Sequence, residues 1–158
     1  MTQDKTSTRH IGAAGELLVQ YKLIKLGVDS ARMTTDSGID LVAYSNNGEK
    51  AYTIQVKTKV QPVLAGGRGK RALGWFLRDD SPAELVATVD LEIDRVWLFS
   101  FQQFRELAQQ HSEKGNFQLY MYVDAPVRTK HQRVHISQFD EFLLENRVNE
   151  LFIDGRKE

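Results

Sequence analysis

The segment from Ser37 to Lys59, SGIDLVAYSNNGEKAYTIQVKTK, constrains the fold more than any other part of the chain. Two alternating stretches, residues 39–45 and 51–59, flank the dipeptide Asn47-Gly48. Asn-Gly favours a tight turn between paired strands because both residues tolerate a positive φ. A two-residue turn and a four-residue loop at this point give the same strand register. The segment therefore predicts an antiparallel hairpin whose facing residues can be named.

In this register one face of the hairpin is apolar, as a face packed on a core must be. The apolar pairs are Ile39 with Val56, Leu41 with Ile54, and Ala43 with Tyr52. The other face pairs Asp40 with Gln55, and Lys57 follows on the same face. Opposed Cβ atoms lie about 5 Å apart, so these three polar side chains are expected to meet. A solvated surface with one Asp–Lys pair, worth about 0–1 kcal/mol, would give the same pattern.

A helix is predicted from residue 11 to residue 26, before the hairpin. Its expected apolar stripe consists of Ile11, Ala14, Leu17, Leu18, Tyr21 and Ile24. Ser7 or Thr8 would cap its start, and Gly27 follows its end. Gly12 and Gly15 flank Glu16, although each glycine costs a helix about 1 kcal/mol relative to alanine. They are consistent with close packing of helix on sheet, or with close approach of a ligand to Glu16.

Helical and extended patterns alternate along the rest of the chain. Extended stretches are expected at residues 31–35, 85–91, 95–101, 117–123 and 133–136, a short apolar piece of unassigned type at 75–77, a loop at 61–71, and helices at 101–110 and 137–152. Ser137 is the expected cap of the last helix. This order predicts an α/β fold, with a mixed central sheet flanked by helices, in one domain spanning residues 1–158.

Composition narrows the class of protein. The chain has 158 residues, a formal net charge of zero and no cysteine. The lack of cysteine excludes disulfides and thiolate metal sites. No apolar run approaches membrane-spanning length, and the polar N-terminus is unlike a signal peptide. We therefore expect a cytoplasmic protein without a membrane span, in which local basic patches hold any nucleic acid.

Two groups of basic residues are candidates for phosphate contact. The first, Lys59, Arg68, Lys70 and Arg71, leads from the hairpin into the glycine-containing loop; the second consists of Arg128, Lys130 and Arg133. A solvated surface is the alternative for both groups. Trp75 and Phe76 could stack on bases, but core packing is the preferred interpretation. His131 and His135 have the spacing of a zinc pair, but no third ligand accompanies them.

Three of these features resemble, in order and spacing, the motif of the PD-(D/E)xK nuclease superfamily. They are Glu16 in AAGELLVQY, Asp40 in SGIDLVAY, and Gln55-Val56-Lys57 in TIQVKTK. The resemblance covers the chain from about residue 10 to residue 60. It implies a restriction-endonuclease-like core with the site on the antiparallel hairpin. Most members carry an acid where this chain has Gln55, so the resemblance is to a Gln-x-Lys variant with one negative charge fewer.

The resemblance implies a metal-dependent DNA endonuclease of the restriction, homing, resolvase or repair type. Glu16, Asp40, Gln55 and Lys57 would form the catalytic set. Asp40, the backbone carbonyl of Val56, and Glu16 would hold Mg²⁺ or Mn²⁺, and Gln55 would be a weaker ligand for the metal or its water. Lys57 would position the attacking water and stabilise charge on the phosphate.

A second interpretation is a catalytically inactive nucleic-acid-binding or assembly module that keeps the nuclease fold. The neutral net charge and Gln55 favour this alternative. An endonuclease that cuts both strands needs two sites, so the first interpretation implies a homodimer or a larger homo-oligomer. The closing helix is one candidate interface, through Phe139, Phe142, Leu143, Leu151 and Phe152. The same residues could instead pack in the core.

Overall fold

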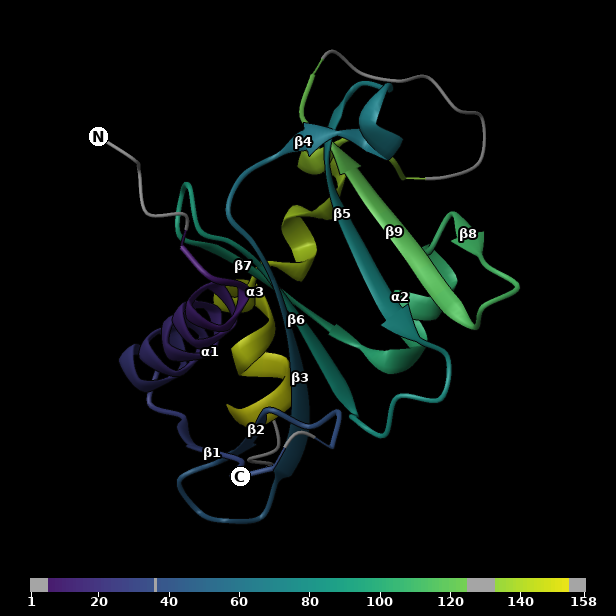
Figure 1. The fold of residues 1–158 in the computed structure, drawn as a ribbon. Helices are drawn as coiled ribbons and strands as arrows, with labels where there is room; N and C mark the ends of the chain where they lie inside the picture. The colour runs from purple at the N-terminus through teal and green to yellow at the C-terminus, as the bar shows by residue number, and fades with distance from the viewer. Residues whose placement is uncertain (1–5, 36, 125–132, 154–158) are drawn as a thin grey trace.

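Two β-sheets, with helices packed against them, form the framework of the chain (Figure 1). The computed structural model describes residues 6–35, 37–124 and 133–153. The strands are β1 (Asp29–Arg32), β2 (Leu41–Tyr44), β3 (Ala51–Lys59), β4 (Val63–Leu64), β5 (Arg71–Arg78), β6 (Leu85–Asp90), β7 (Arg95–Ser100), β8 (Gln110–His111) and β9 (Asn116–Tyr122). The helices are α1 (Thr8–Lys25), α2 (Phe101–Leu107) and α3 (Leu144–Val148), with short 3-10 segments η1 (Ala65–Gly67) and η2 (Ile136–Phe142) and a π-helical η3 (Asn149–Ile153).

The larger sheet has the strand order β1-β2-β3-β6-β7 and is mixed. β3 pairs with β2 antiparallel and with β6 parallel, and β6 pairs with β7 antiparallel. The smaller sheet has the order β4-β5-β9-β8 and is antiparallel throughout. The predicted α/β architecture, with a mixed central sheet and an antiparallel hairpin flanked by helices, is confirmed.

The hairpin has the predicted register. Leu41 pairs with Ile54 and Ala43 with Tyr52. The connection is the four-residue loop, closed by a 2.9 Å hydrogen bond from the Ser45 amide to the Lys50 carbonyl. Gly48 has a φ of 70°, whereas Asp94 is the only described non-glycine residue with a positive φ, so the two-residue turn does not form.

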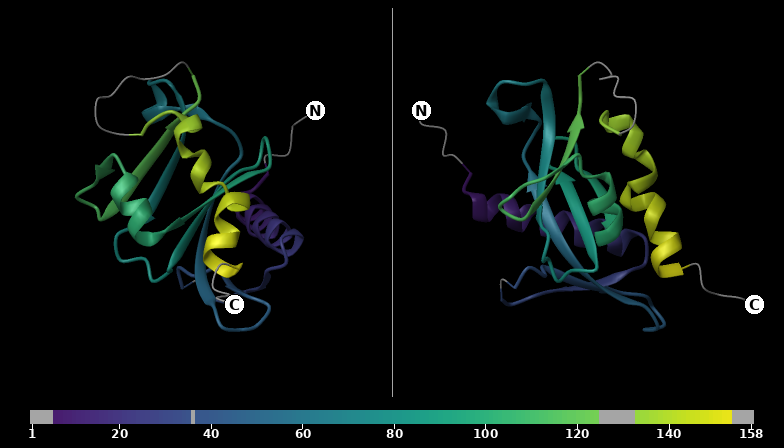
Figure 2. Two further views of the ribbon diagram at one scale, coloured as in Figure 1. Left: turned by 180° about the vertical axis from the view of Figure 1, so that it is seen from behind. Right: turned by 90° about the vertical axis from the view of Figure 1, so that its right-hand side faces the viewer.

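Two hydrophobic cores lie on opposite faces of the larger sheet. One includes Val19 and Leu23 of α1 together with residues of α3, and the other includes Trp75 of the smaller sheet and Trp97 of β7. β6 is buried at all six positions because both of its faces are covered. Figure 2 shows the C-terminal helical segment on the side of the molecule that faces away from the viewer in Figure 1.

Helix α1 is present, but its predicted apolar stripe is wrong for four residues, of which Ala14 is the small one. Leu17, Tyr21 and Ile24 are 54%, 57% and 61% exposed, whereas the buried positions are Gly15, Val19 and Leu23. The buried positions recur every four residues, which is also a helical spacing. The face of α1 that packs on the sheet is therefore the one that carries Gly15, because Gly15 makes the close contact with β3.

The predicted cap and end of α1 are confirmed, although the helix begins at Thr8 rather than at residue 11. The Ser7 side chain caps the helix by accepting a hydrogen bond from the His10 amide at 3.3 Å. Gly27 follows the C-cap residue Leu26 with a φ of 81°. This left-handed conformation ends the helix at little cost because glycine has no Cβ.

The predicted closing helix at 137–152 is wrong as a single helix. Leu143 has φ −52° and ψ 136°, and this extended residue separates η2 from α3. It forms an isolated antiparallel bridge with Trp97 of β7, so pairing with the sheet interrupts the helix. The cap of η2 is His135, not Ser137. Most of the large apolar residues of this segment are buried in the cores, including Phe139, Phe142 and Phe152.

Other predicted elements differ at their ends. The stretch expected at 31–35 is β1, the loop at 61–71 contains β4 and η1, and the apolar piece at 75–77 belongs to β5. The helix expected at 101–110 ends at Leu107, because β8 then pairs with β9. Instead of a strand, residues 133–136 contain one isolated bridge, from His135 to Tyr122. Within the described residues, no helix is long and apolar enough to cross a membrane.

Candidate active site

Asp40 lies where β2 leaves the hairpin ladder. Its amide donates to the Ile54 carbonyl at 2.9 Å, and its Oδ2 accepts from the Val56 amide at 2.6 Å. In a regular ladder the Val56 amide would donate to the carbonyl of residue 39. The carboxylate takes that place, so the predicted Ile39–Val56 pair is not part of the ladder. Asp40 is instead attached to both neighbours of Gln55, which holds its side chain against the backbone of β3.

Glu16 reaches the same region from the first half of α1. Its Oε2 accepts hydrogen bonds from Arg32 Nη2 at 2.7 Å and from Arg32 Nε at 3.0 Å. Glu16, Arg32 and Asp40 line one open hollow of about 390 Å³. The two predicted carboxylates therefore border one space, and the Glu16 side chain is only 23% exposed.

Sequence reasoning missed Arg32. Arg32 is the last residue of β1 and pairs with Leu41, the residue that follows Asp40 in the chain. The pairing of β1 with β2 carries its guanidinium to the hollow, and a short four-residue strand gives little local sign of its partner. A bidentate contact from Nε and Nη2 to one carboxylate oxygen neutralises the Glu16 charge.

Gln55 lies apart from this hollow. Its Oε1 accepts a hydrogen bond from the Ser81 hydroxyl at 2.7 Å. Gln55 lines a second open hollow, together with Gly38, Ser81 and the ion pair between Arg78 and Asp80. Asp40 therefore binds the β3 backbone on either side of Gln55, while the two side chains line different hollows.

The Arg78–Asp80 pair places two opposite charges beside the second hollow. Arg78 Nε lies 3.2 Å from Asp80 Oδ1, and Nη2 lies 3.3 Å from Oδ2. This hydrogen bonding and the charge of Arg78 lower the pKa of Asp80, and Asp80 in turn raises the pKa of Arg78. Asp80 is therefore ionised across the physiological pH range and remains paired beside Gln55.

Lys57 is half-buried in the middle of β3. The pairing of β3 with β6 runs unbroken from Ile54 with Leu85 to Lys59 with Asp90. Because side chains alternate along a continuous strand, Lys57 shares a face with Gln55 and not with Ile54, as the register predicted. Lys57 thus follows directly after Val56, whose amide binds the Asp40 carboxylate.

The two glycines of α1 have different surroundings. A Cβ on Gly15 would lie 1.8 Å from Thr58 Oγ1 and 2.9 Å from Thr58 Cβ, whereas a Cβ on Gly12 would meet nothing within 4 Å. Gly15 allows α1 to contact β3, which sets the position of Glu16, the next residue along the chain. Gly12 borders the hollow lined by Glu16 and Asp40. Close packing against Thr58 therefore explains Gly15. Gly12 is not closely packed and lies beside the open space of the candidate site.

The basic residues of the first group differ in their engagement. Lys59 Nζ lies 5.9 Å from the centre of the Phe76 ring. Arg71 Nε lies 3.5 Å from Asp124 Oδ1. Arg68 and Lys70 are exposed on the loop between β4 and β5.

In the second group, Arg128 and Lys130 lie outside the described residues, as does His131. Arg133 forms an ion pair with Glu141 and lies 5.5 Å from the centre of the Phe142 ring. His135 caps η2 through Ser137. The structural roles of Arg133 and His135 weaken the case for phosphate or zinc binding by these residues.

The donor set of the first hollow suits a hard divalent cation with few protein ligands. Among the described residues, no cluster of three or more His, Cys, Asp or Glu side chains could hold a metal ion. Mg²⁺ is commonly held by one or two carboxylates, with waters and substrate phosphates completing its octahedron. Asp40 and Glu16 meet this requirement, although binding by Glu16 requires that Arg32 release it.

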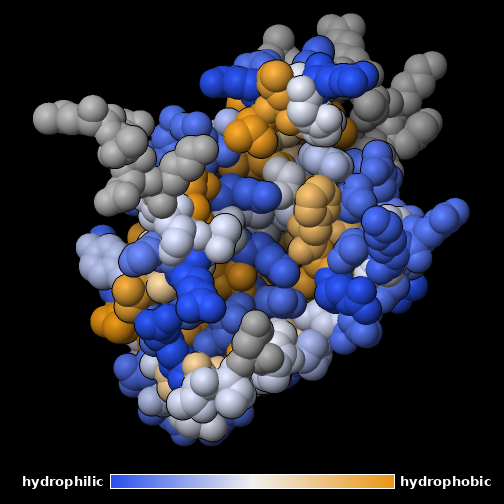
Figure 3. Space-filling view, viewed as in Figure 1, coloured by the Kyte–Doolittle hydropathy of each residue, from blue (hydrophilic) through white to orange (hydrophobic). Residues whose placement is uncertain are grey.

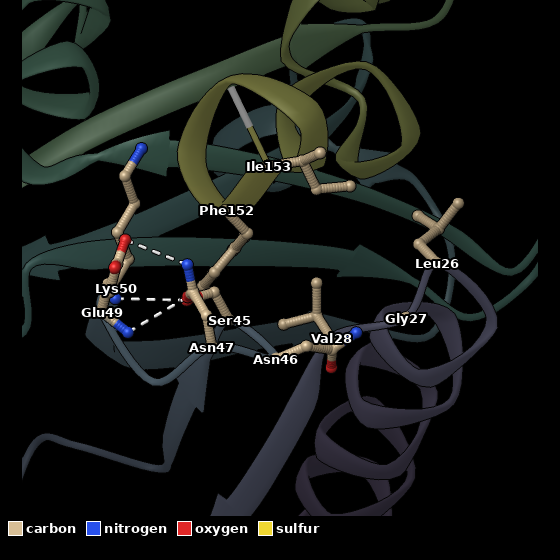
Figure 4. Close-up of a pocket in the computed structure, with 10 residues that line it drawn as sticks. All are labelled: Leu26, Gly27, Val28, Ser45, Asn46, Asn47, Glu49, Lys50, Phe152 and Ile153. Carbon is tan, nitrogen blue, oxygen red and sulfur yellow. Dashed lines mark hydrogen bonds between the residues drawn. The ribbon is translucent and has the colours of Figure 1, made fainter. Parts of the chain in front are cut away.

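Another hollow, of about 200 Å³, lies at the opposite end of β2, between the end of α1, the hairpin loop and the end of η3 (Figure 4). Its polar groups bond to one another, including Asn47 Nδ2 to Glu49 Oε2 at 3.0 Å and the Lys50 amide to Ser45 Oγ at 3.2 Å. None of the sequence-predicted site residues lines it.

No protein-family model matches the chain, and no curated protein matches its sequence. Among solved structures, the fold is similar to that of a bacterial homing endonuclease, I-Ssp6803I, with a TM-score of 0.54. The two chains are 15% identical, and the match covers 81% of this chain and 86% of the endonuclease chain. Similarity at this identity establishes the fold alone. The chain has the restriction-endonuclease-like fold that its hairpin and first helix predicted.

Proposed function

We propose that the chain is a metal-dependent DNA endonuclease that hydrolyses phosphodiester bonds and acts as one domain, residues 1–158. The observation that carries the proposal is the position of Asp40. Its carboxylate accepts from the Val56 amide of β3, its own amide donates to the Ile54 carbonyl, and it shares a hollow with Glu16. The similarity to a homing endonuclease fold supports the same interpretation.

In this proposal Asp40, the Val56 carbonyl and Glu16 hold Mg²⁺ or Mn²⁺. When bound, the cation polarises a phosphoryl oxygen and lowers the pKa of a coordinated water. Asp40 contributes a carboxylate that the β3 backbone already orients, so little side-chain freedom is lost on binding. Lys57, on the face of β3 that also carries Gln55, positions the attacking water and stabilises negative charge on the phosphate.

Arg32 adds a step that the sequence did not suggest. Its guanidinium neutralises Glu16 at 2.7 Å, so a cation and Arg32 compete for the same carboxylate. DNA phosphates attract guanidinium groups through bidentate hydrogen bonds. We propose that Arg32 leaves Glu16 for a DNA phosphate, which makes metal binding and DNA binding mutually favourable.

Two roles are compatible with the position of Gln55: a ligand of the metal or its water, and a contact to the substrate phosphate. Its amide oxygen accepts from Ser81 and still has a lone pair for a metal-bound water, and its amide nitrogen can donate to a substrate phosphate. Gln55→Glu separates them. A water or metal ligand would bind the cation more tightly with the added charge, whereas a phosphate contact would become repulsive and activity would fall.

The proposed DNA contacts come from both basic groups. Lys59, Arg68, Lys70 and Arg71 lie on β3 and around the β4–β5 loop, and Arg128, Lys130 and Arg133 form the second group. Such contacts are independent of sequence and make the affinity depend on salt. The first group is the stronger candidate for DNA contact because Arg68 and Lys70 are exposed.

A homodimer or larger homo-oligomer is also proposed, with the interface moved from the C-terminal segment to α1. The large apolar residues of the C-terminal segment are mostly used in the cores. Leu17, Tyr21 and Ile24, in contrast, form an exposed stripe on α1 with spacings of four and three residues. This is the spacing of a coiled-coil seam, which a second copy of the same helix can match.

The alternative is an inactive nucleic-acid-binding or assembly module. It is favoured by the engagement of Glu16 with Arg32 and of Gln55 with Ser81, because both side chains are then bonded within the protein. It shares the fold and the basic residues with the first proposal. Cleavage therefore decides between the two.

The test incubates the purified chain with plasmid, branched and single-stranded DNA in Mg²⁺ or Mn²⁺, with EDTA as the control. Asp40→Ala should abolish cleavage, and Lys57→Ala should reduce it about a hundredfold or more. Both variants should still bind DNA. Asp29→Ala, an exposed acid on β1, is the matched control and should cleave normally. DNA binding without cleavage of any substrate would establish the binding module.

A further inference from the structure

The outer face of the smaller sheet carries three neighbouring aromatic side chains. Phe76 of β5 is 45% exposed, and Tyr120 and Tyr122 of β9 are half-buried. The Phe76 and Tyr120 ring centres lie 6.1 Å apart at 80°, and those of Tyr120 and Tyr122 lie 6.2 Å apart at 30°. Trp75, next to Phe76, is buried in the core. Of the two residues that the sequence suggested for base stacking, Trp75 therefore lies in the core and Phe76 on the surface.

Strand pairing helps to leave the three rings partly exposed. Tyr120 lies opposite Gly74, and Tyr122 lies opposite Ala72. These partners are small, so neither of them carries a side chain that covers the ring opposite it. The Tyr120 ring lies over Gly74, where an added Cβ would come within 3.1 Å of its Cε1. Burial, and then the neighbouring Tyr122, raise the pKa of Tyr120, so its phenol remains neutral at physiological pH.

Positive charge borders this aromatic face on the side of the candidate site. Lys59 Nζ lies 5.9 Å from the Phe76 ring centre. Lys59 follows Lys57 on the same face of β3, because side chains of one strand alternate between its faces. Arg71 begins β5 at the end of the sheet where Ala72 pairs with Tyr122. The aromatic face is thus continuous with the candidate site through Lys59.

We propose that Phe76, Tyr120 and Tyr122 form a stacking platform for unpaired bases of single-stranded DNA, with Lys59 contacting the phosphate backbone. The proposal deepens the proposed function and rests on it only in taking DNA as the ligand. Aromatic rings stack on bases of any sequence, while basic groups beside them follow the backbone. In a duplex the faces of the bases are covered by their neighbours, so such a platform favours unpaired strands. Figure 3 shows apolar side chains among hydrophilic ones over β5 and β9.

The test measures binding without chemistry. Fluorescence anisotropy with EDTA present gives the dissociation constants of a labelled single strand and of the same sequence as a duplex. Phe76→Ala should weaken single-strand binding at least about fivefold, as expected for the loss of a base-stacking ring, and should leave duplex binding unchanged. Tyr44→Ala is the matched control, because Tyr44 is 41% exposed on β2 at the hairpin loop, away from the platform.

A second variant keeps the proposal open to refutation if Phe76→Ala alters the sheet. Phe76→Trp retains a stacking ring, so it should bind the single strand as wild type does, and the fluorescence of its new indole should be quenched on binding. The native tryptophans, Trp75 and Trp97, are buried and give a constant background. Unquenched fluorescence of the Phe76→Trp variant, or equal single-strand affinity of Phe76→Ala and wild type, would overturn the platform.

The outcomes for the platform and for the endonuclease are distinguishable. Single-strand binding that depends on Phe76, in a protein that cleaves nothing, supports the platform and refutes the endonuclease. Cleavage that depends on Asp40, in a protein whose single-strand affinity is unchanged by Phe76→Ala, supports the endonuclease and refutes the platform. An equal loss of duplex and single-strand affinity in Phe76→Ala would mean that the ring contributes to general structure, and this also overturns the platform.

Discussion

Gly15→Ala tests whether the contact between α1 and β3 positions the candidate site. The new Cβ would lie 1.8 Å from Thr58 Oγ1, so the helix or the strand must move. Overpacking of a well-packed interface costs about 1–3 kcal/mol. Replacing glycine by alanine in a helix returns about 1 kcal/mol. We therefore expect a net loss of up to about 2 kcal/mol in the free energy of unfolding, and reduced cleavage because Glu16 moves with the helix.

Gly12→Ala is the matched control, one turn earlier in the same helix. Nothing lies within 4 Å of its added Cβ, so only the helix propensity changes. This variant should gain up to about 1 kcal/mol in the free energy of unfolding. Urea denaturation, followed by circular dichroism, measures both variants under identical conditions. Equal stabilities of the Gly15 and Gly12 variants would refute the argument that close packing requires Gly15.

Thr58→Ala supplies a second check on the same contact. Thr58 Oγ1 is buried without a hydrogen-bond partner in the described part of the chain, so its removal breaks no hydrogen bond described there. The double variant Gly15→Ala/Thr58→Ala should recover part of the lost stability, because the closest clash is gone. Additive free-energy changes in the double-mutant cycle would show that the two residues do not interact.

Three further predictions concern other groups. Burial raises the pKa of Asp90, so its contribution to stability is lost as pH rises through the folded-state value; Asp90→Asn should raise the urea midpoint at pH 7 but not below about pH 3, where both states are protonated. Leu17→Glu should dissociate an oligomer held by α1, and sedimentation velocity showing a wild-type monomer would contradict that interface. Arg32→Ala should tighten Mn²⁺ binding in the absence of DNA and weaken DNA binding, by calorimetry and anisotropy; an unchanged Mn²⁺ affinity would disprove competition for Glu16.

The sequence alone determined the hairpin. Alternation along residues 39–45 and 51–59, with Asn47-Gly48 between them, specified the register that pairs Leu41 with Ile54. These signals are local, because strand period and turn chemistry involve neighbours in the chain. The capping of α1 by Ser7 and its end near Gly27 were determined in the same way.

The tertiary structure decided which faces are covered. Contact between Gly15 and Thr58 rotated α1, so that Leu17, Tyr21 and Ile24 face outward despite their helical spacing. A bridge from Leu143 to Trp97 interrupted the last helix, although its apolar period runs on. In both cases a contact between residues distant in the chain overrode a pattern that amphipathicity alone leaves open.

The same distinction holds for the candidate site. The chain order identified Asp40, Gln55 and Lys57, because one hairpin carries all three. It did not reveal that Gln55 bonds to Ser81 in a second hollow, or that Arg32 pairs with Glu16. Those partners come from segments that only strand pairing and loop packing bring close. Local patterns therefore specified the elements that carry the site, and long-range packing decided the hydrogen-bond partners of its side chains.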